Sequence, residues 1–115
     1  MQYTNLGRTG LRVSRMGVGC GGPSRIGRQA GCTERQSAHL IRLAVDAGVN
    51  LIDTAESYGT EDIVGLALKD LPRDQIVLAT KKGAGTSTSA ADMQAGMDAA
   101  LQRLDRKSTR LNSSH

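Results

Sequence analysis

The sequence contains no tryptophan or phenylalanine, and only two residues each of tyrosine, proline and cysteine among its 115 residues. It has no apolar run near the roughly 20 residues that a membrane-spanning helix requires. Its first ten residues, MQYTNLGRTG, lack the apolar core of a secretory signal. Cys20 and Cys32 are spaced like neither a disulfide framework nor a zinc site. We therefore expect a cytoplasmic protein with no membrane partner and no metal site.

The length of the chain limits it to one domain of ordinary size. A complete (β/α)8 barrel is excluded, because that fold needs about 250 residues. The content of 38% apolar and 23% charged residues is typical of a globular chain and not of a disordered one.

The net charge of +4 does not indicate a nucleic-acid partner. Part of the excess lies in residues 105–115, and without them 12 basic and 10 acidic residues remain. That balance is ordinary for a protein surface, and no basic patch with interleaved aromatic residues is present. We expect no binding to nucleic acid.

Residues 105–115, DRKSTRLNSSH, differ in kind from the helical pattern before them. They are identical to the in-frame translation of a widely used sequencing-library adapter. We interpret them as an artefactual tail and leave them out of the fold prediction, as is done for processing segments. The domain prediction then covers residues 1–104.

The remaining residues alternate between strand and helix patterns. Residues 3–14 alternate around the turn Gly7–Gly10, which predicts a β-hairpin. Capping-box pairs at Thr33/Gln36 and Ser89/Asp92 indicate two helix starts. We expect strands over 16–20, 49–52 and 75–79, and helices over 33–48, 60–71 and 89–104.

This order predicts an α/β fold with a parallel sheet: an N-terminal β-hairpin followed by three β–α units. Three units cannot close a barrel, so the chain has the pattern of the first part of a larger domain. The strand at 75–79 would be an open apolar edge. We expect non-specific self-association through this edge strand.

Polar residues that can carry chemistry follow the predicted strands. Asp53 and Tyr58 follow the second strand of the parallel sheet, and Lys81 follows the third. A phenol ordinarily has a pKa of about 10, and a nearby ammonium makes a phenol more acidic. A carboxylate keeps that ammonium charged and in place. The three residues together are candidates for a proton donor, whereas each alone is equally compatible with packing or a surface ion pair.

A second motif suggests a different fold. Residues 17–22 fit the pattern G-x-G-x-x-G after a strand, and Asp53 could be the acid that binds a ribose. That reading, a Rossmann-like dinucleotide-binding fragment, requires a helix directly after the last glycine. Pro23 and further glycines intervene here, and Asp53 lies 31 positions after Gly22 instead of about 20.

Several segments in order resemble one family. The run GVNLIDTAESYG (48–59) is similar to the signature of aldo-keto reductases, and three other segments agree with it: NLGRTGLRVSRMGVGC (5–20), EDIVGLAL (61–68) and IVLATKKG (76–83). The resemblance covers about residues 1–104. It implies an NADP(H)-dependent oxidoreductase that reduces aldehydes or ketones, built on a (β/α)8 TIM barrel whose floor the hairpin closes.

Carried over position by position, the resemblance gives each candidate a role. Tyr58 would be the general acid, Lys81 would make its hydroxyl more acidic, and Asp53 would support Lys81. Gly19 and Gly21 would let a loop approach the nicotinamide or a small carbonyl substrate, with Asp53 also at the cofactor site. Lys82 would be a loop charge.

The chain departs from the family pattern in two respects. The family's fourth catalytic residue is a histidine at the end of a fourth strand, and most of its cofactor contacts come from the second half of the barrel. Neither is present before the tail. We therefore expect a truncated chain that is inactive alone and binds NADP(H) weakly or not at all. The alternative is a non-catalytic module on the same fold that binds a cofactor or a partner.

Overall fold

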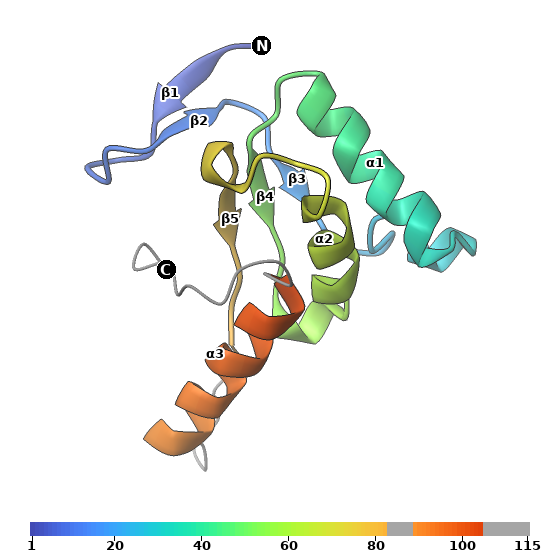
Figure 1. The fold of residues 1–115 in the computed structure, drawn as a ribbon, viewed down its shortest axis with the longest axis vertical. Coiled ribbons are helices and arrows are strands. Elements are labelled where there is room, and N and C mark those ends of the chain that lie inside the picture. The colour runs from blue at the N-terminus through green and yellow to red at the C-terminus, as the bar shows by residue number, and fades with distance from the viewer. Residues whose placement is uncertain (83–88, 105–115) are drawn as a thin grey trace.

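The computed structural model describes residues 1–82 and 89–104. Figure 1 shows a hairpin, a parallel sheet and three helices. The strands are β1 (Tyr3–Asn5), β2 (Arg12–Ser14), β3 (Val18–Gly19), β4 (Leu51–Asp53) and β5 (Val77–Ala79), and the helices are α1 (Glu34–Asp46), α2 (Glu61–Leu68) and α3 (Ala90–Leu104). Three short 3-10 helices are η1 (Arg28–Ala30), η2 (Glu56–Tyr58) and η3 (Arg73–Gln75).

The sheet is parallel, with the strand order β3-β4-β5. Its register places Gly19 beside Asp53, and Asp53 beside Ala79. The carboxyl ends of the three strands therefore share one edge, at the lower end of the sheet in Figure 1. The predicted hairpin and three β–α units are confirmed.

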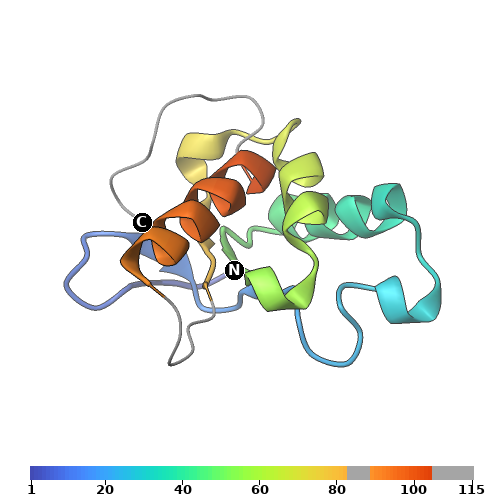
Figure 2. The same cartoon turned by 90° about the horizontal axis from the view of Figure 1, so that it is seen from below.

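The helices cover the sheet in chain order. Helix α2 packs against both α1 and α3, and Figure 2 shows it between them. The backbones of α2 and α3 approach so closely at Gly65 that a Cβ there would overlap the carbonyl oxygen of Arg103. Only glycine allows this distance between the two helices.

Both predicted capping boxes are present. The Thr33 hydroxyl accepts a hydrogen bond from the Gln36 N–H at 3.1 Å, while the Gln36 side chain accepts one from the Thr33 N–H at 2.9 Å. Ser89 and Asp92 make the equivalent pair before α3. These bonds satisfy backbone donors that have no partner within the helix.

The hairpin lies at the amino ends of the parallel strands and is attached through Asn50. The amide oxygen of Asn50 accepts from the Ser14 N–H at 2.6 Å, and its amide nitrogen donates to the Arg12 carbonyl at 2.9 Å. The Tyr3 hydroxyl donates to the Gly48 carbonyl at 2.7 Å. The hairpin is therefore held by the loop that precedes β4, away from the carboxyl ends.

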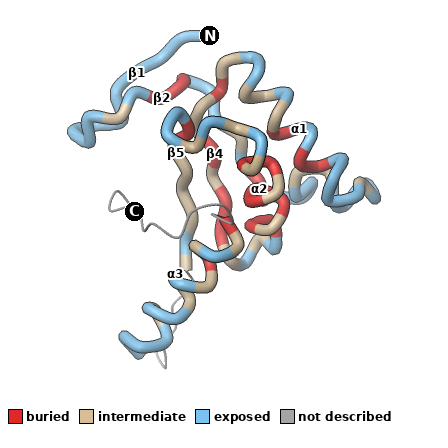
Figure 3. The backbone as a smooth tube through the Cα atoms, viewed as in Figure 1, coloured by how far each residue is buried: buried red, intermediate tan, exposed pale blue. Residues whose placement is uncertain are grey.

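The core lies between the sheet and the helices, as the red segments in Figure 3 show. Ile52 of β4 is fully buried, and so are Ile41 of α1 and Ile63 and Val64 of α2. Burying a side chain of this size stabilises a fold by about 1.5–3 kcal/mol. The α2 helix contributes most densely to this core.

The elements are shorter than the sequence patterns predict. Helix α2 ends at Leu68, not at 71, and the chain continues in tighter turns, in which the Asp70 N–H binds the Ala67 carbonyl and the Leu71 N–H binds the Leu68 carbonyl. The strand predicted at 75–79 begins at Val77, since η3 takes up the preceding residues. The interpretation of residues 105–115 as a tail concerns residues outside the described ranges. In the described part of the chain, no helix is long and apolar enough to cross a membrane.

Candidate active site

The three candidate residues of the sequence analysis lie together at the carboxyl ends of β4 and β5. The Lys81 ammonium donates to Asp53 Oδ1 at 2.6 Å and to the Thr54 carbonyl at 2.9 Å. The pairing of the two chain segments continues past the strands, with the Glu56 N–H bound to the Lys81 carbonyl at 3.0 Å. This backbone contact brings Lys81 beside the segment that carries Tyr58.

Tyr58 ends η2, and its ring faces the same ammonium. The Lys81 Nζ lies 5.3 Å from the ring centroid, within the range of a cation–π contact. Gly59 follows with a φ of +70°, and its carbonyl accepts from the Arg28 guanidinium at 2.6 Å. The turn that carries Tyr58 is therefore held in place by Arg28, a residue that lies outside the ends of β4 and β5.

The electrostatics of the pair favour a charged lysine. The hydrogen bond to Asp53 is the largest cause that raises the pKa of Lys81, and the charge of Asp53 and the nearby Tyr58 add to it against a smaller cost of desolvation. Lys81 is thus an ammonium throughout the neutral range. A fixed positive charge is what a phenol needs beside it in order to give up a proton.

Cys20 lies directly behind this group without taking part in it. Its side chain is fully buried in the core, and its N–H donates to the Asp53 carbonyl at 2.9 Å. Burial, followed by the charge of Asp53, raises the pKa of the Cys20 thiol to about 11. A thiol in this state packs as a small apolar group and is not a nucleophile at neutral pH.

The two glycines predicted to approach a cofactor have different surroundings. Nothing lies within 4 Å of a Cβ added at Gly19, which sits beside Asp53 in the sheet. A Cβ added at Gly21 would lie 2.8 Å from atoms of the Tyr58 ring. The backbone at Gly19 is therefore open, whereas Gly21 is in contact with the tyrosine. The cofactor roles of Gly19, Gly21 and Asp53 stay predictions.

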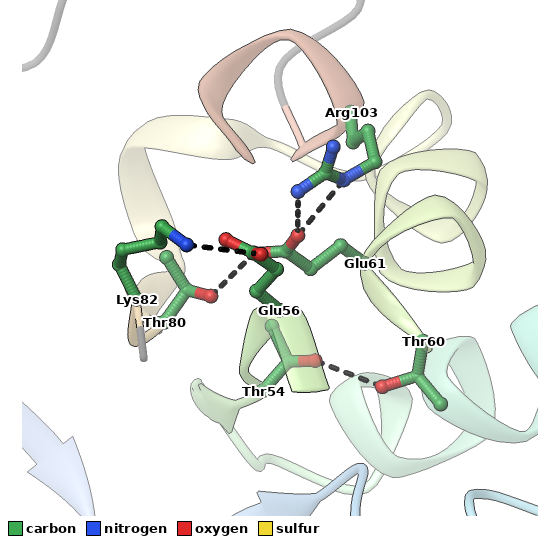
Figure 4. Close-up of polar contacts among 7 residues, drawn as sticks. All are labelled: Thr54, Glu56, Thr60, Glu61, Thr80, Lys82 and Arg103. Atoms are coloured by element: carbon green, nitrogen blue, oxygen red, sulfur yellow. Dashed lines mark hydrogen bonds and ion pairs between the residues drawn. The ribbon is translucent and has the colours of Figure 1, made fainter. Parts of the chain in front are cut away.

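A second polar cluster lies behind the strand ends and was not predicted. It is centred on Glu61, the first residue of α2, which is 2% exposed. Figure 4 shows its partners, Thr80 and Arg103, together with the neighbouring pairs Thr54–Thr60 and Glu56–Lys82. In the sequence, Glu61 has only the pattern of an acidic residue in the first turn of a helix. That pattern does not predict its contacts with Thr80 and Arg103.

Lys82 differs from its prediction as a loop charge. Its ammonium lies 3.3 Å from Glu56 Oε1, and its side chain is 21% exposed. Its methylene groups pass over Gly96 of α3, where an added Cβ would displace them. The two adjacent lysines therefore make different contacts. Lys81 lies at the candidate site, and Lys82 contacts η2 and α3.

Comparison with known proteins identifies the family. Residues 16–115 match the model of the Aldo/keto reductase family. The chain belongs to this family. Three of the solved structures that it matches are barrel proteins of the family, of which it covers 41%, 36% and 32%. The predicted fold class, the first part of a (β/α)8 barrel, is therefore confirmed.

Three similar proteins show the extent of the match. The chain is 44% identical over 88 residues to aldo-keto reductase YhdN of Bacillus subtilis, covering 70% of this chain and 25% of that protein. It is 44% identical over 91 residues to the NADH-specific methylglyoxal reductase of Escherichia coli, covering 72% and 27%. An aldo-keto reductase of Klebsiella pneumoniae in complex with NADPH has a TM-score of 0.64 at 31% identity, covering 81% and 32%. The chain spans about a quarter of the length of these curated relatives.

Proposed function

We propose that this chain carries the proton-donating part of the active site of an NADP(H)-dependent carbonyl reductase. The observation that carries the proposal is the position of the Lys81 ammonium, which binds Asp53 at 2.6 Å and faces the Tyr58 ring at 5.3 Å from its centroid. A carboxylate, an ammonium and a phenol in contact can act together as a proton donor. A purely structural ion pair between Lys81 and Asp53 would not need a phenol beside it.

Each residue has a distinct part in the proposed reaction. Tyr58 donates its hydroxyl proton to the carbonyl oxygen of the substrate, Lys81 stabilises the negative charge left on the phenol oxygen, and Asp53 holds Lys81 in position. The proton on Tyr58 is then replaced from water. Gly19 leaves the backbone beside Asp53 open to a flat ring.

A reduced nicotinamide dinucleotide, when bound, supplies the hydride that this donor set lacks. With a hydride supplied to the carbonyl carbon in this way, the electron pair of the C=O π bond would take up the Tyr58 proton as an O–H bond. The product is an alcohol, and the substrate class is therefore small aldehydes or ketones. We propose NADP(H) as the cofactor. The NADPH complex of the Klebsiella relative supports this choice, and the NADH-specific Escherichia coli relative is the competing case.

We further propose that the 115-residue chain alone has no measurable reductase activity. It spans about a quarter of the length of its curated relatives, so about three quarters of their residues have no counterpart in the matched segment. Titration of the chain with NADPH should show no saturable change in cofactor fluorescence. Reduction of an aldehyde by the purified chain, lost in Tyr58→Phe, would contradict this.

The reductase proposal is tested in a chimera in which residues 1–104 replace the matching segment of the Bacillus subtilis relative. We expect the chimera to oxidise NADPH in the presence of an aldehyde, followed at 340 nm. Tyr58→Phe should lower kcat by about 10²–10⁴-fold, the range for loss of a general acid. Tyr3→Phe, at the other tyrosine of the chain, is the matched control.

The results of this experiment separate the proposal from its alternative. A chimera that loses activity in Tyr58→Phe but not in Tyr3→Phe supports a reductase. A folded chimera that binds NADPH without reducing any aldehyde supports the non-catalytic module. Equal preference for NADH would remove the NADP(H) assignment while leaving the carbonyl reductase in place.

A further inference from the structure

The polar cluster behind the candidate site holds a buried charge in a fixed geometry. Glu61 Oε1 accepts from Nε and Nη2 of Arg103 at 2.8 and 2.5 Å, and Glu61 Oε2 accepts from the Thr80 hydroxyl at 2.6 Å. A buried carboxylate is stable only when its oxygens have such partners. The three residues come from α2, α3 and the end of β5, so the cluster joins both helices to one strand end (Figure 4).

The adjacent strand end is attached to the same helix. The hydroxyls of Thr54 and Thr60 lie 2.8 Å apart, and both residues are fully buried. Thr60 directly precedes Glu61 at the start of α2. Two consecutive residues of one helix start therefore hold the ends of β4 and β5.

The residues that are held are the sequence neighbours of the candidate pair. Thr54 follows Asp53, and Thr80 precedes Lys81. In extended chain, successive side chains point to opposite faces. The threonines accordingly contact the helix layer, while Lys81 and Asp53 meet each other on the other side at 2.6 Å. The distance between the ends of β4 and β5 is thus set by contacts on both faces of the sheet: the threonine contacts with the start of α2 on one face, and the Lys81–Asp53 pair on the other.

We propose that Glu61 and Thr80, together with Arg103 and the Thr54–Thr60 pair, are positioning residues that keep Lys81 and Asp53 in contact. The helix start acts as a support, and Thr80 transmits its position to Lys81 through one peptide unit. The catalytic meaning of the support rests on the proposed function, but the positioning itself does not.

The test measures Lys81 directly in the 115-residue chain. The sequence has four lysines, so ¹³C-labelled lysine gives a simple NMR spectrum, and the signal missing from Lys81→Met is that of Lys81. The Asp53 hydrogen bond raises the pKa of Lys81. Thr80→Val removes the hydroxyl at nearly constant shape, so it should move the Lys81 titration to lower pH, while Thr80→Ser should leave it as in the parent.

The outcomes are decided by the matched pair of variants. A lower titration midpoint in Thr80→Val but not in Thr80→Ser, with unchanged far-UV circular dichroism over the pH range of the titration, supports the proposal. An unchanged midpoint in Thr80→Val overturns it. A midpoint lowered equally in both variants also overturns it, because the hydroxyl is then not the cause.

A second variant covers the case in which Thr80→Val does not fold. Arg103→Lys keeps the positive charge but cannot reproduce the two hydrogen bonds to Glu61, so it loosens the cluster far from the strand end. It should lower the Lys81 midpoint as well, and an unchanged midpoint would overturn the proposal. Because neither measurement uses substrate or cofactor, an inactive chimera would refute the proposed reductase without affecting this result.

Discussion

Gly21 packs against the ring of Tyr58 so closely that a Cβ on Gly21 would lie 2.8 Å from Cε2 and Cζ of that ring. The loop after β3 thereby forms one wall for the tyrosine, and the ring has the Lys81 ammonium within cation–π range. The position of the phenol depends on a residue that has no side chain of its own.

Gly21→Ala should therefore displace the Tyr58 ring. In a Tyr3→Phe background Tyr58 is the one tyrosine, and the sequence has no tryptophan, so near-UV circular dichroism reports on Tyr58. We expect Gly21→Ala to reduce this signal. Gly19→Ala is the control, since nothing lies within 4 Å of its Cβ. Equal changes in both variants would show that the packing against Tyr58 is not responsible.

The raised pKa of Cys20 predicts an order of thiol reactivity. Cys20 is fully buried and Cys32 is partly exposed, so Ellman's reagent at pH 8 should label Cys32 first in the folded chain and both thiols in urea. In Cys32→Ser, labelling should stay slow until the chain unfolds. Equal labelling rates of the two cysteines in the folded chain would contradict the buried position of Cys20.

The same thiol makes stability fall at alkaline pH. An unfolded cysteine ionises near pH 8.5, whereas burial and Asp53 keep folded Cys20 protonated up to about 11. The favourable contribution is complete below the lower value and is lost as pH rises through the higher one. The difference in unfolding midpoint between the parent and Cys20→Ala should narrow over this interval, and a constant difference would contradict it.

The capping box at the start of α1 should contribute measurably to folding. Thr33→Ala removes the acceptor for the Gln36 N–H, and such a loss typically costs about 1 kcal/mol. Urea unfolding followed by far-UV circular dichroism measures the change. Thr33→Ser keeps the acceptor and should remain within about 0.5 kcal/mol of the parent. A Thr33→Ala variant as stable as the parent would show that the capping box does not contribute to the free energy of unfolding.

The edge of the sheet predicts self-association of the chain. In the described residues β5 pairs with β4 alone, so its other side presents unpaired backbone groups. We expect size-exclusion chromatography with light scattering to show mass rising with concentration, and Val77→Lys to reduce that rise. Leu43→Lys, which adds the same charge to an exposed position of α1, controls for net charge. A monodisperse parent with a cooperative melt would count against the edge.

Much of the fold could be predicted because its signals are local. Thr33 with Gln36, and Ser89 with Asp92, mark helix starts within four residues of sequence, and Gly48, the last residue of the predicted helical segment 33–48, has a positive φ of +106°. Asp53, Tyr58 and Lys81 were found together because parallel strands bring their carboxyl ends to one edge. Their proximity follows from topology alone, whereas their chemical roles stay predictions.

The contacts that could not be predicted join residues far apart in sequence. Glu61 and Arg103 are 42 residues apart, and each alone is typical of a helix end, acidic at the start and basic at the finish. The hydrogen bond from Arg42 of α1 to the Leu66 carbonyl of α2 likewise joins residues that are 24 apart. Such pairings depend on how helices pack, which no local pattern records.

Because the hairpin is attached at the amino ends of the strands, substitutions there and substitutions at the candidate site should have separate effects. Asn50 and Gly48 receive the hairpin's hydrogen bonds at the amino ends of the strands, while every candidate reacting group stands at the opposite ends. Substitutions in the first fifteen residues would consequently alter how firmly the hairpin closes the amino ends of the strands, without changing the candidate reacting groups at the carboxyl ends. The amino ends of the strands thus hold the hairpin, and the carboxyl ends of the same strands hold the candidate reacting groups.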